Sequence, residues 1–131
     1  VYTMPELASV GMTEREAKET CAAVSVGEFP FSGNGKSHAT GNVVGSVRVV
    51  RDDHTGEVLG VHIVGHAATE MIHAAMPLLG STADSMVFAH PTYSEGLGEA
   101  YEAAFGSATH MPFRAPQKIP GSILQTGGEE G

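Results

Sequence analysis

GSVRVVR at residues 45–51 and EVLGVHIV at residues 57–64 are two runs rich in Val and Ile. Residues with branched or large apolar side chains of this kind favour β-strands. The stretch between them, DDHTG at 52–56, is polar and contains glycine, which is typical of a tight turn. The three stretches therefore predict an antiparallel β-hairpin, and this hairpin is the clearest element of the sequence.

A helix and a strand are predicted upstream of the hairpin. Thr13 and Glu16 have the spacing of a capping box, which predicts a helix over residues 14–21. VSVGEF at 24–29 alternates as a strand does and is followed by a proline. The segment 32–40 is small, polar and contains glycine, so we expect a loop or a loose helical turn there.

Two further helices are predicted downstream of the hairpin. Residues 69–79 carry apolar side chains at helical spacing, and Gly80 stands where such a helix ends. Pro77 is expected to kink or shorten this helix, because proline lacks an N–H group and clashes with the preceding turn. Thr92 and Glu95 repeat the capping-box spacing ahead of an apolar stripe, which consists of Leu97, Ala100, Tyr101, Ala104 and Phe105.

Helices and antiparallel strands in this arrangement predict an α+β fold, in which helices pack against an antiparallel sheet. The 131 residues are enough for one such core. Beyond Pro112 the chain is rich in Pro and Gly, with little to offset the entropy lost on ordering. We therefore expect one domain over residues 1–112 and a disordered tail over 113–131. Because the chain begins at Val1, we also expect it to be a fragment of a longer protein.

Charge and apolar patterning exclude two classes of partner. The chain has 7 Lys and Arg residues against 15 Asp and Glu residues, a net charge of −8, and its basic residues are scattered. Nucleic acid is therefore not expected to bind. No apolar run is long enough to cross a bilayer, so no membrane association is expected either. The single cysteine excludes an internal disulfide framework and fits a reducing compartment, so we expect a cytoplasmic location.

Cysteine and histidine side chains offer few other candidates for chemistry. Cys21 lies on the apolar side of the first predicted helix, where a buried and unreactive thiol is expected. His62 and His66, with His73 further along, come nearest to a metal-ligand spacing among the seven histidines. They come without a clear third ligand or a thiol partner, so we expect no metal site.

The segment HPTYSE at 90–95 holds a constellation suited to acid–base chemistry. His90 stands just before a predicted helix and Glu95 lies within its first turn, so a compact turn would bring the two side chains together. A carboxylate bonded to one ring nitrogen leaves the other free, and an imidazole with an ordinary pKa of about 6.5 exchanges a proton near neutral pH. The structural alternative is that Glu95 is only a capping residue and His90 a loop histidine beside Pro91.

The same segment resembles a family signature. His-Pro-Thr-x-Ser-Glu is similar to the motif that closes the pyridine nucleotide-disulfide oxidoreductases. The opening segment 2–14 resembles the start of that family's dimerisation domain, and 60–65 with 70–72 resembles its middle strand and helix. Residues 106–112 resemble the tail of dihydrolipoamide dehydrogenases, so the resemblance covers residues 2–112.

The resemblance implies a homodimeric flavoenzyme in which this domain supplies most of the subunit interface. FAD and NAD would be held by other domains of the same polypeptide, and a 2-oxo acid dehydrogenase complex is a further implied partner. His90 would face the flavin and disulfide of the other subunit and take a proton from the incoming dithiol, with Glu95 orienting it. The backbone of His90 and Pro91 would lie near the partner's flavin. Because the chain has no Gly-x-Gly-x-x-Gly loop and no cysteine pair, we expect the isolated domain to be inactive and to bind no cofactor.

Two alternatives stay open at this point. Phe88 stands where dihydrolipoamide dehydrogenases often carry a second histidine. A mercuric, glutathione or transhydrogenase-type reductase, which shares the fold and differs in its electron acceptor, is therefore a second interpretation. The third is a dimerisation module with no catalytic role.

Overall fold

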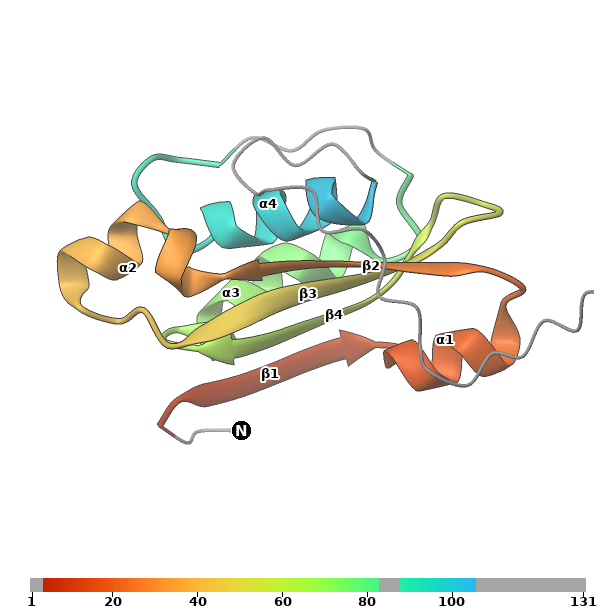
Figure 1. Cartoon of the computed structure of the whole chain (residues 1–131), viewed down its shortest axis with the longest axis horizontal. Helices are drawn as coiled ribbons and strands as arrows, with labels where there is room; N and C mark the ends of the chain where they lie inside the picture. The colour runs from red at the N-terminus through yellow and green to blue at the C-terminus, as the bar shows by residue number, and fades with distance from the viewer. Residues whose placement is uncertain (1–3, 83–87, 106–131) are drawn as a thin grey trace, which may run out of the picture.

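The computed structural model describes residues 4–82 and 88–105. The predicted hairpin forms the centre of an antiparallel sheet, and two outer strands flank it in the order β1-β4-β3-β2 (Figure 1). The four strands of this described sheet are β1 (Glu6–Gly11), β2 (Val24–Pro30), β3 (Gly45–Asp52) and β4 (Val58–Gly65).

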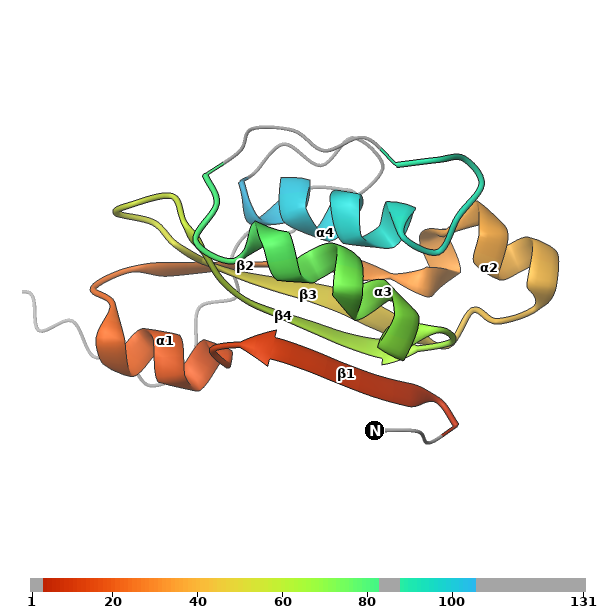
Figure 2. The ribbon, with the colours of Figure 1, turned by 180° about the vertical axis from the view of Figure 1, so that it is seen from behind.

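Two helices cover one face of this sheet, as Figure 2 shows. The helix α3 (Ala68–Ala75) packs on β1 and β4, and the helix α4 (Glu95–Ala104) packs on β2 and β3. The core lies between these helices and the sheet, and its largest buried side chains include Tyr101, Phe31, Ile63, Leu97 and Val47. The predicted α+β fold, an antiparallel sheet with helices packed against it, is confirmed.

The other face of the sheet is polar along its middle. Val47 and Ile63 are paired and buried under the helices, so the next pair along the strands, Arg48 and His62, points to the opposite face. The helix α1 (Glu14–Thr20) lies by this second face, where the Glu14 carboxylate accepts a hydrogen bond from Arg48.

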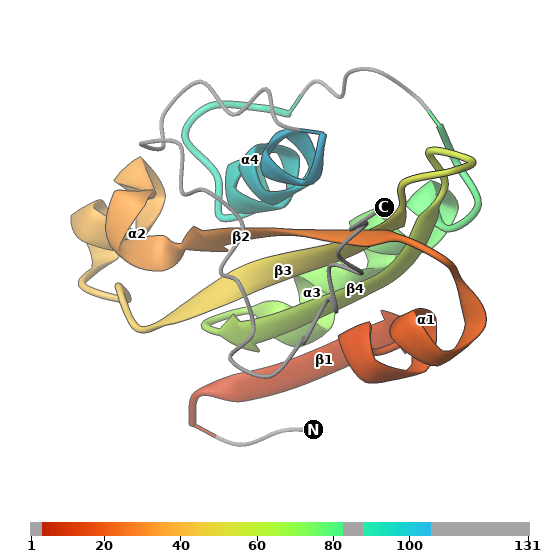
Figure 3. The ribbon, with the colours of Figure 1, turned by 45° about the vertical axis from the view of Figure 1, so that its right-hand side comes forward.

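The connection between β2 and β3 contains two short helices, η1 (Phe31–Gly33) and α2 (Gly35–Thr40), where a loop or a loose helical turn was expected. Asn34 caps α2, because its side-chain oxygen accepts the Ser37 N–H at 2.9 Å. Gly41 ends α2 in the left-handed conformation that favours glycine. Figure 3 shows α2 beside the start of α4, at one end of the sheet.

Two helix predictions are confirmed in detail. The capping box has both of its bonds, from Glu16 N to the Thr13 hydroxyl at 3.2 Å and from Thr13 N to the Glu16 carboxylate at 2.7 Å. α3 stops at Ala75, before Pro77, and continues as the short helix η2 (Met76–Leu78). None of the described helices is long and apolar enough to cross a membrane.

β1 is a strand that the sequence does not predict. Its sequence, ELASVG, has neither a run of β-branched residues nor a clear alternation. It pairs with β4 along its whole length, from Glu6 opposite Gly65 to Gly11 opposite Gly60. Its conformation therefore depends on β4, which is distant in the sequence.

Glu6 on β1 also caps α3. The residue before this helix, Ala67, has a left-handed backbone and no capping side-chain hydrogen bond. The Glu6 carboxylate instead accepts hydrogen bonds from the Thr69 N–H at 3.0 Å and the Thr69 hydroxyl at 2.8 Å. These bonds lower the pKa of Glu6, with the backbone N–H of Thr69 having the largest effect.

Replacing Glu6 with Gln is expected to lower the stability of the fold at neutral pH. It is also expected to make that stability fall less steeply as the pH is lowered. Because the folded-state pKa of Glu6 lies below its ordinary value of 4.5, the carboxylate stabilises the fold fully above that value. This contribution is lost as the pH falls through the folded-state pKa, so the difference in stability between wild type and variant narrows there. Thermal unfolding followed from about pH 7 to about pH 3 measures this difference.

The matched control for this measurement is Glu19→Gln, at an exposed position on α1. It also removes one negative charge, but at a position distant from the start of α3. The stability of this variant is therefore expected to depend on pH as that of the wild type does. A Glu6→Gln profile that runs parallel to wild type at all pH values would contradict the capping role of Glu6.

Candidate functional site

His90 and Glu95 lie side by side at the start of α4. His90 Nδ1 is 2.7 Å from Glu95 Oε1, which is a short hydrogen bond. An ionised carboxylate can only accept, so Nδ1 carries the proton and Nε2 is the ring nitrogen left to accept one. The imidazole is 79% exposed and the carboxylate 28% exposed. The structure thus brings together the two predicted side chains and presents the imidazole outward.

The capping box predicted from Thr92 and Glu95 is wrong. α4 begins at Glu95 with Ser94 in the N-cap position, and the Thr92 hydroxyl donates to the Ala89 carbonyl at 2.7 Å. The N–H groups of Gly96 and Leu97 bond to the backbone carbonyls of Tyr93 and Ser94, and Ser94 makes no side-chain capping bond. The Glu95 carboxylate therefore folds back over the loop, with Oε2 accepting the Thr92 N–H at 2.9 Å and Oε1 facing His90.

The loop that carries His90 is bonded to the segment around α2. Asn34 Nδ2 donates to the Thr92 carbonyl at 3.0 Å, and Asn42 Nδ2 donates to the Tyr93 hydroxyl at 3.3 Å. The Tyr93 hydroxyl also shares a hydrogen bond with Thr40, and these two side-chain bonds, that with Thr40 first, lower the pKa of Tyr93. These contacts were missed by the sequence analysis, since no local spacing signals a partner more than fifty residues away.

The other motif positions lie close to the pair. Pro91 follows His90 through a cis peptide bond and lines a shallow groove of about 340 Å³ together with Lys36 and Tyr93. Phe88, which stands where a second histidine was considered, is partly buried and packs against the core. A Cβ added at Gly98 of α4 would lie 2.9 Å from the Phe88 ring, so this ring rests directly on the helix.

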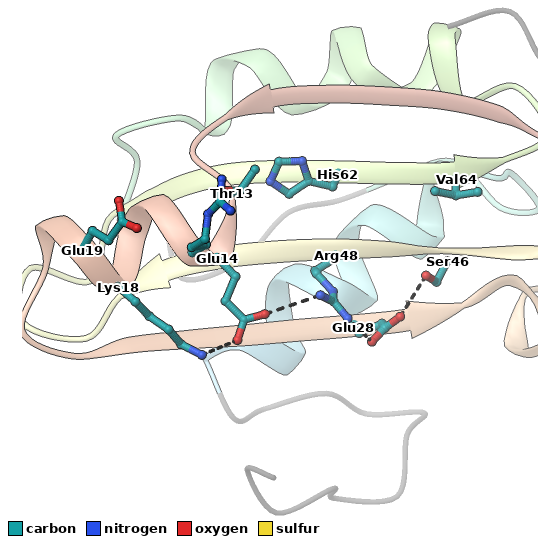
Figure 4. A pocket seen from close by; sticks show the side chains of 10 residues that line it. Thr13, Glu14, Lys18, Glu19, Glu28, Ser46, Arg48, His62 and Val64 are labelled. Carbon is teal, nitrogen blue, oxygen red and sulfur yellow. Dashed lines mark hydrogen bonds and ion pairs between the residues drawn. The ribbon is translucent and has the colours of Figure 1, made fainter. Parts of the chain in front are cut away.

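A larger groove of about 810 Å³ lies on the other face of the sheet, beside α1 (Figure 4). Four of its charged side chains pair with one another, since Glu14 bonds to both Lys18 and Arg48, at 2.6 Å and 3.4 Å. Arg48 also pairs with Glu28 at 3.2 Å. This groove contains neither His90 nor Glu95, so it is not the candidate site.

The histidines considered for a metal site have separate roles. Both ring nitrogens of His62 are bonded, Nδ1 to the Ser9 hydroxyl at 3.0 Å and Nε2 to the Met12 carbonyl at 2.9 Å. The His66 ring lies against Tyr93, with 5.1 Å between the ring centroids. Within residues 4–82 and 88–105, no three His, Cys, Asp or Glu side chains are grouped as a metal site requires.

Cys21 departs from its predicted position. α1 ends one residue earlier, so Cys21 is the C-cap, in extended conformation, and is only half-buried, although it was expected on the buried face of the helix. Burial raises the pKa of the Cys21 thiol, and the neighbouring Asp52 carboxylate raises it further. The thiol therefore stays protonated at neutral pH, in agreement with the expected lack of reactivity.

Comparison with known proteins identifies the family of this chain. The family model of the pyridine nucleotide-disulphide oxidoreductase dimerisation domain matches residues 1–101. The chain is 41% identical over 116 residues to the mitochondrial dihydrolipoyl dehydrogenase of Pisum sativum, a match that covers 85% of this chain and 23% of that protein. It is 43% identical over 116 residues to a dihydrolipoyl dehydrogenase of Bacillus subtilis, covering 85% of this chain and 24% of that one.

A solved structure agrees with the fold as well. The HOCl-induced flavoprotein disulfide reductase RclA of Escherichia coli superposes with a TM-score of 0.71 at 25% identity, over 78% of this chain and 25% of that protein. The chain thus spans about a quarter of the length of the relatives it matches. By its sequence and its fold, the chain belongs to the dimerisation-domain family of the pyridine nucleotide-disulphide oxidoreductases.

Proposed function

We propose that this domain supplies the acid–base pair of an FAD- and NAD-dependent dihydrolipoamide dehydrogenase, across the interface of a homodimer. The observation that supports this most directly is the 2.7 Å contact between Glu95 and an imidazole that is 79% exposed. This imidazole faces outward, so a reacting partner from outside the domain can reach it.

His90 would act as the base that activates the substrate dithiol. A free thiol, with a pKa of about 8.5, is mostly protonated at neutral pH, and the thiolate is the nucleophile. The proton of one substrate thiol would move to His90 Nε2, and the resulting thiolate would attack the enzyme disulfide. This attack would join the substrate to one enzyme sulfur and release the other as a thiolate. The second substrate thiol would then give its proton to the released sulfur and attack the mixed disulfide, which closes the substrate disulfide and frees the remaining enzyme sulfur as a thiolate.

Glu95 would hold His90 in the tautomer that this step needs. Its carboxylate keeps the proton on Nδ1 and stabilises the positive charge that the ring gains when Nε2 is protonated. The exposed backbone of His90 and Pro91 fits a position against a flavin held by the other subunit. FAD would pass the electron pair from the reduced sulfurs to NAD.

The names of the relatives favour dihydrolipoamide as the substrate over the other acceptors considered. The relatives at about 40% identity are dihydrolipoyl dehydrogenases, from both plant mitochondria and bacteria. Because their compartments differ, the cytoplasmic location stays a prediction, as does a 2-oxo acid dehydrogenase complex as a partner. The division into a domain over residues 1–112 and a tail stays a prediction too, since 106–131 lie outside the described residues.

Mixed dimers of the full-length enzyme test whether the pair acts across the interface. One subunit carries His90→Gln and the other lacks the redox cysteines, so neither homodimer is active. If the pair acts in trans, each mixed dimer contains one complete site, and random mixing restores about a quarter of the wild-type rate of dihydrolipoamide oxidation with NAD. Mixed dimers purified with two different tags that remain inactive would contradict the proposal.

A further inference from the structure

Asn34 is a buried polar side chain whose hydrogen bonds join α2 to the loop before α4. It is only 3% exposed. Its Oδ1 accepts hydrogen bonds from the Ser37 N–H at 2.9 Å and the Ser37 hydroxyl at 3.1 Å, and its Nδ2 donates to the Thr92 carbonyl at 3.0 Å. The two bonds to Ser37 are buried and the bond to Thr92 is part-buried, so water cannot readily replace a bond that the buried amide loses.

Thr92 connects Asn34 to the acid–base pair through two further hydrogen bonds. The Thr92 carbonyl is held by Asn34, and its N–H is held by Glu95 Oε2 at 2.9 Å. The other carboxylate oxygen, Oε1, accepts from His90 Nδ1. Since Thr92 is fixed through both its carbonyl and its N–H, the direction in which Glu95 points depends on where Asn34 holds this residue.

We infer that Asn34 is a positioning residue for the reaction, acting through Thr92 and Glu95 on His90. The inference rests on the proposed function of the His90–Glu95 pair and adds a residue from another element. A second contact, from Asn42 to the Tyr93 hydroxyl, joins the same two segments, but Asn42 is only half-buried, whereas Asn34 is 3% exposed. Asn34 is therefore the more buried of the two residues that hold the loop, and the one bonded to the backbone of Thr92.

Asn34→Asp separates positioning from helix capping. The aspartate keeps an oxygen for Ser37, so α2 remains capped, but it places an oxygen in front of the Thr92 carbonyl where a donor stood. In the full-length homodimer, kcat for dihydrolipoamide oxidation is expected to fall by about 10- to 100-fold with little change in KM, because orientation is lost and binding is not. The control is Thr13→Ala, which removes the cap of α1 far from the loop and is expected to leave kcat unchanged.

The mixed dimers give a readout that a merely structural role would not affect. Asn34→Asp is placed either in the subunit that donates His90 or in the subunit that already carries His90→Gln. We expect it to lower the restored rate only in the first case, because in the second the loop it positions has no functional histidine. An equal loss in both arrangements would mean that Asn34 only stabilises the fold, and would overturn the inference.

The remaining outcomes are also informative. A folded, FAD-containing Asn34→Asp homodimer with wild-type kcat would refute the positioning role and leave the proposed function standing. A wild-type enzyme that does not oxidise dihydrolipoamide would refute the proposed function instead. If Asn34→Asp does not fold, Ser37→Ala provides the milder change, since it removes one of the bonds that orient the amide. It is expected to give a smaller loss of kcat at unchanged KM, and no loss would refute the positioning role.

Discussion

Replacing His90 with Gln in the full-length enzyme is expected to lower kcat for dihydrolipoamide oxidation by about 10²- to 10⁴-fold, the usual contribution of a positioned general base. Glutamine has a similar size and can still hydrogen-bond to Glu95, but it cannot take up a proton at neutral pH. Because the imidazole is largely exposed and belongs to no core cluster, the fold is expected to be unaffected. Steady-state kinetics, with FAD absorbance and sedimentation to confirm cofactor content and dimerisation, measure the effect.

His73→Gln is the matched control for this substitution. His73 is exposed in the last turn of α3, so the same substitution can be made there at a position outside the loop. It is expected to keep the wild-type kcat. If His90→Gln also kept it, with FAD and dimer intact, the domain would be a dimerisation module without a catalytic role.

Gly27→Ala is expected to cause a large loss of stability. A Cβ at this position of β2 would lie 2.1 Å from the Ala100 carbonyl oxygen and 2.2 Å from the Ala104 nitrogen. Both contacts are with the backbone of α4, which no side-chain rotation relieves, so the helix must move away from the sheet. Overpacking of this kind costs about 3 kcal/mol, and urea denaturation of wild type and variant measures it.

The same substitution is expected to impair activity, because α4 begins with Glu95 and its displacement separates Glu95 from His90. Gly35→Ala is the control: its Cβ would meet no atom within 4 Å, and the residue lies at the start of α2. Alanine favours a helix more than glycine does, so this variant is expected to be as stable as wild type or slightly more stable. A Gly27→Ala protein with wild-type stability would show that α4 does not pack on β2 as closely as the structure indicates.

Elements encoded by nearby residues could be predicted from the sequence. The hairpin is specified by its own β-branched strands and the polar turn between them, and α3 by its apolar spacing and Pro77. The His90–Glu95 contact spans five residues and depends on one turn of chain. The cap of α4 was assigned wrongly because a spacing of three residues does not fix where the helix begins: Ser94 is the N-cap, and the Glu95 carboxylate bonds back to the Thr92 N–H.

Features that join distant segments could not be predicted. β1 becomes a strand only beside β4, and the cap of α3 comes from Glu6, 63 residues before Thr69. The bond from Asn34 to Thr92 spans 58 residues and forms only after the sheet has brought α2 next to α4. A single sequence contains no local pattern for such contacts, because their geometry is set by the packing of whole elements.

The bonds between residues 31–42 and the loop before α4 also bear on how the family can vary. Connections between neighbouring antiparallel strands usually tolerate insertions and deletions. Here the ends of the connection are fixed by β2 and β3, and an added residue within α2 turns one end of that helix against the other by about 100°. Asn34 and Asn42 could then no longer both meet the loop. Homologues that share this chemistry should therefore conserve the length of this connection, whereas the hairpin turn at the far end of the sheet is free to change.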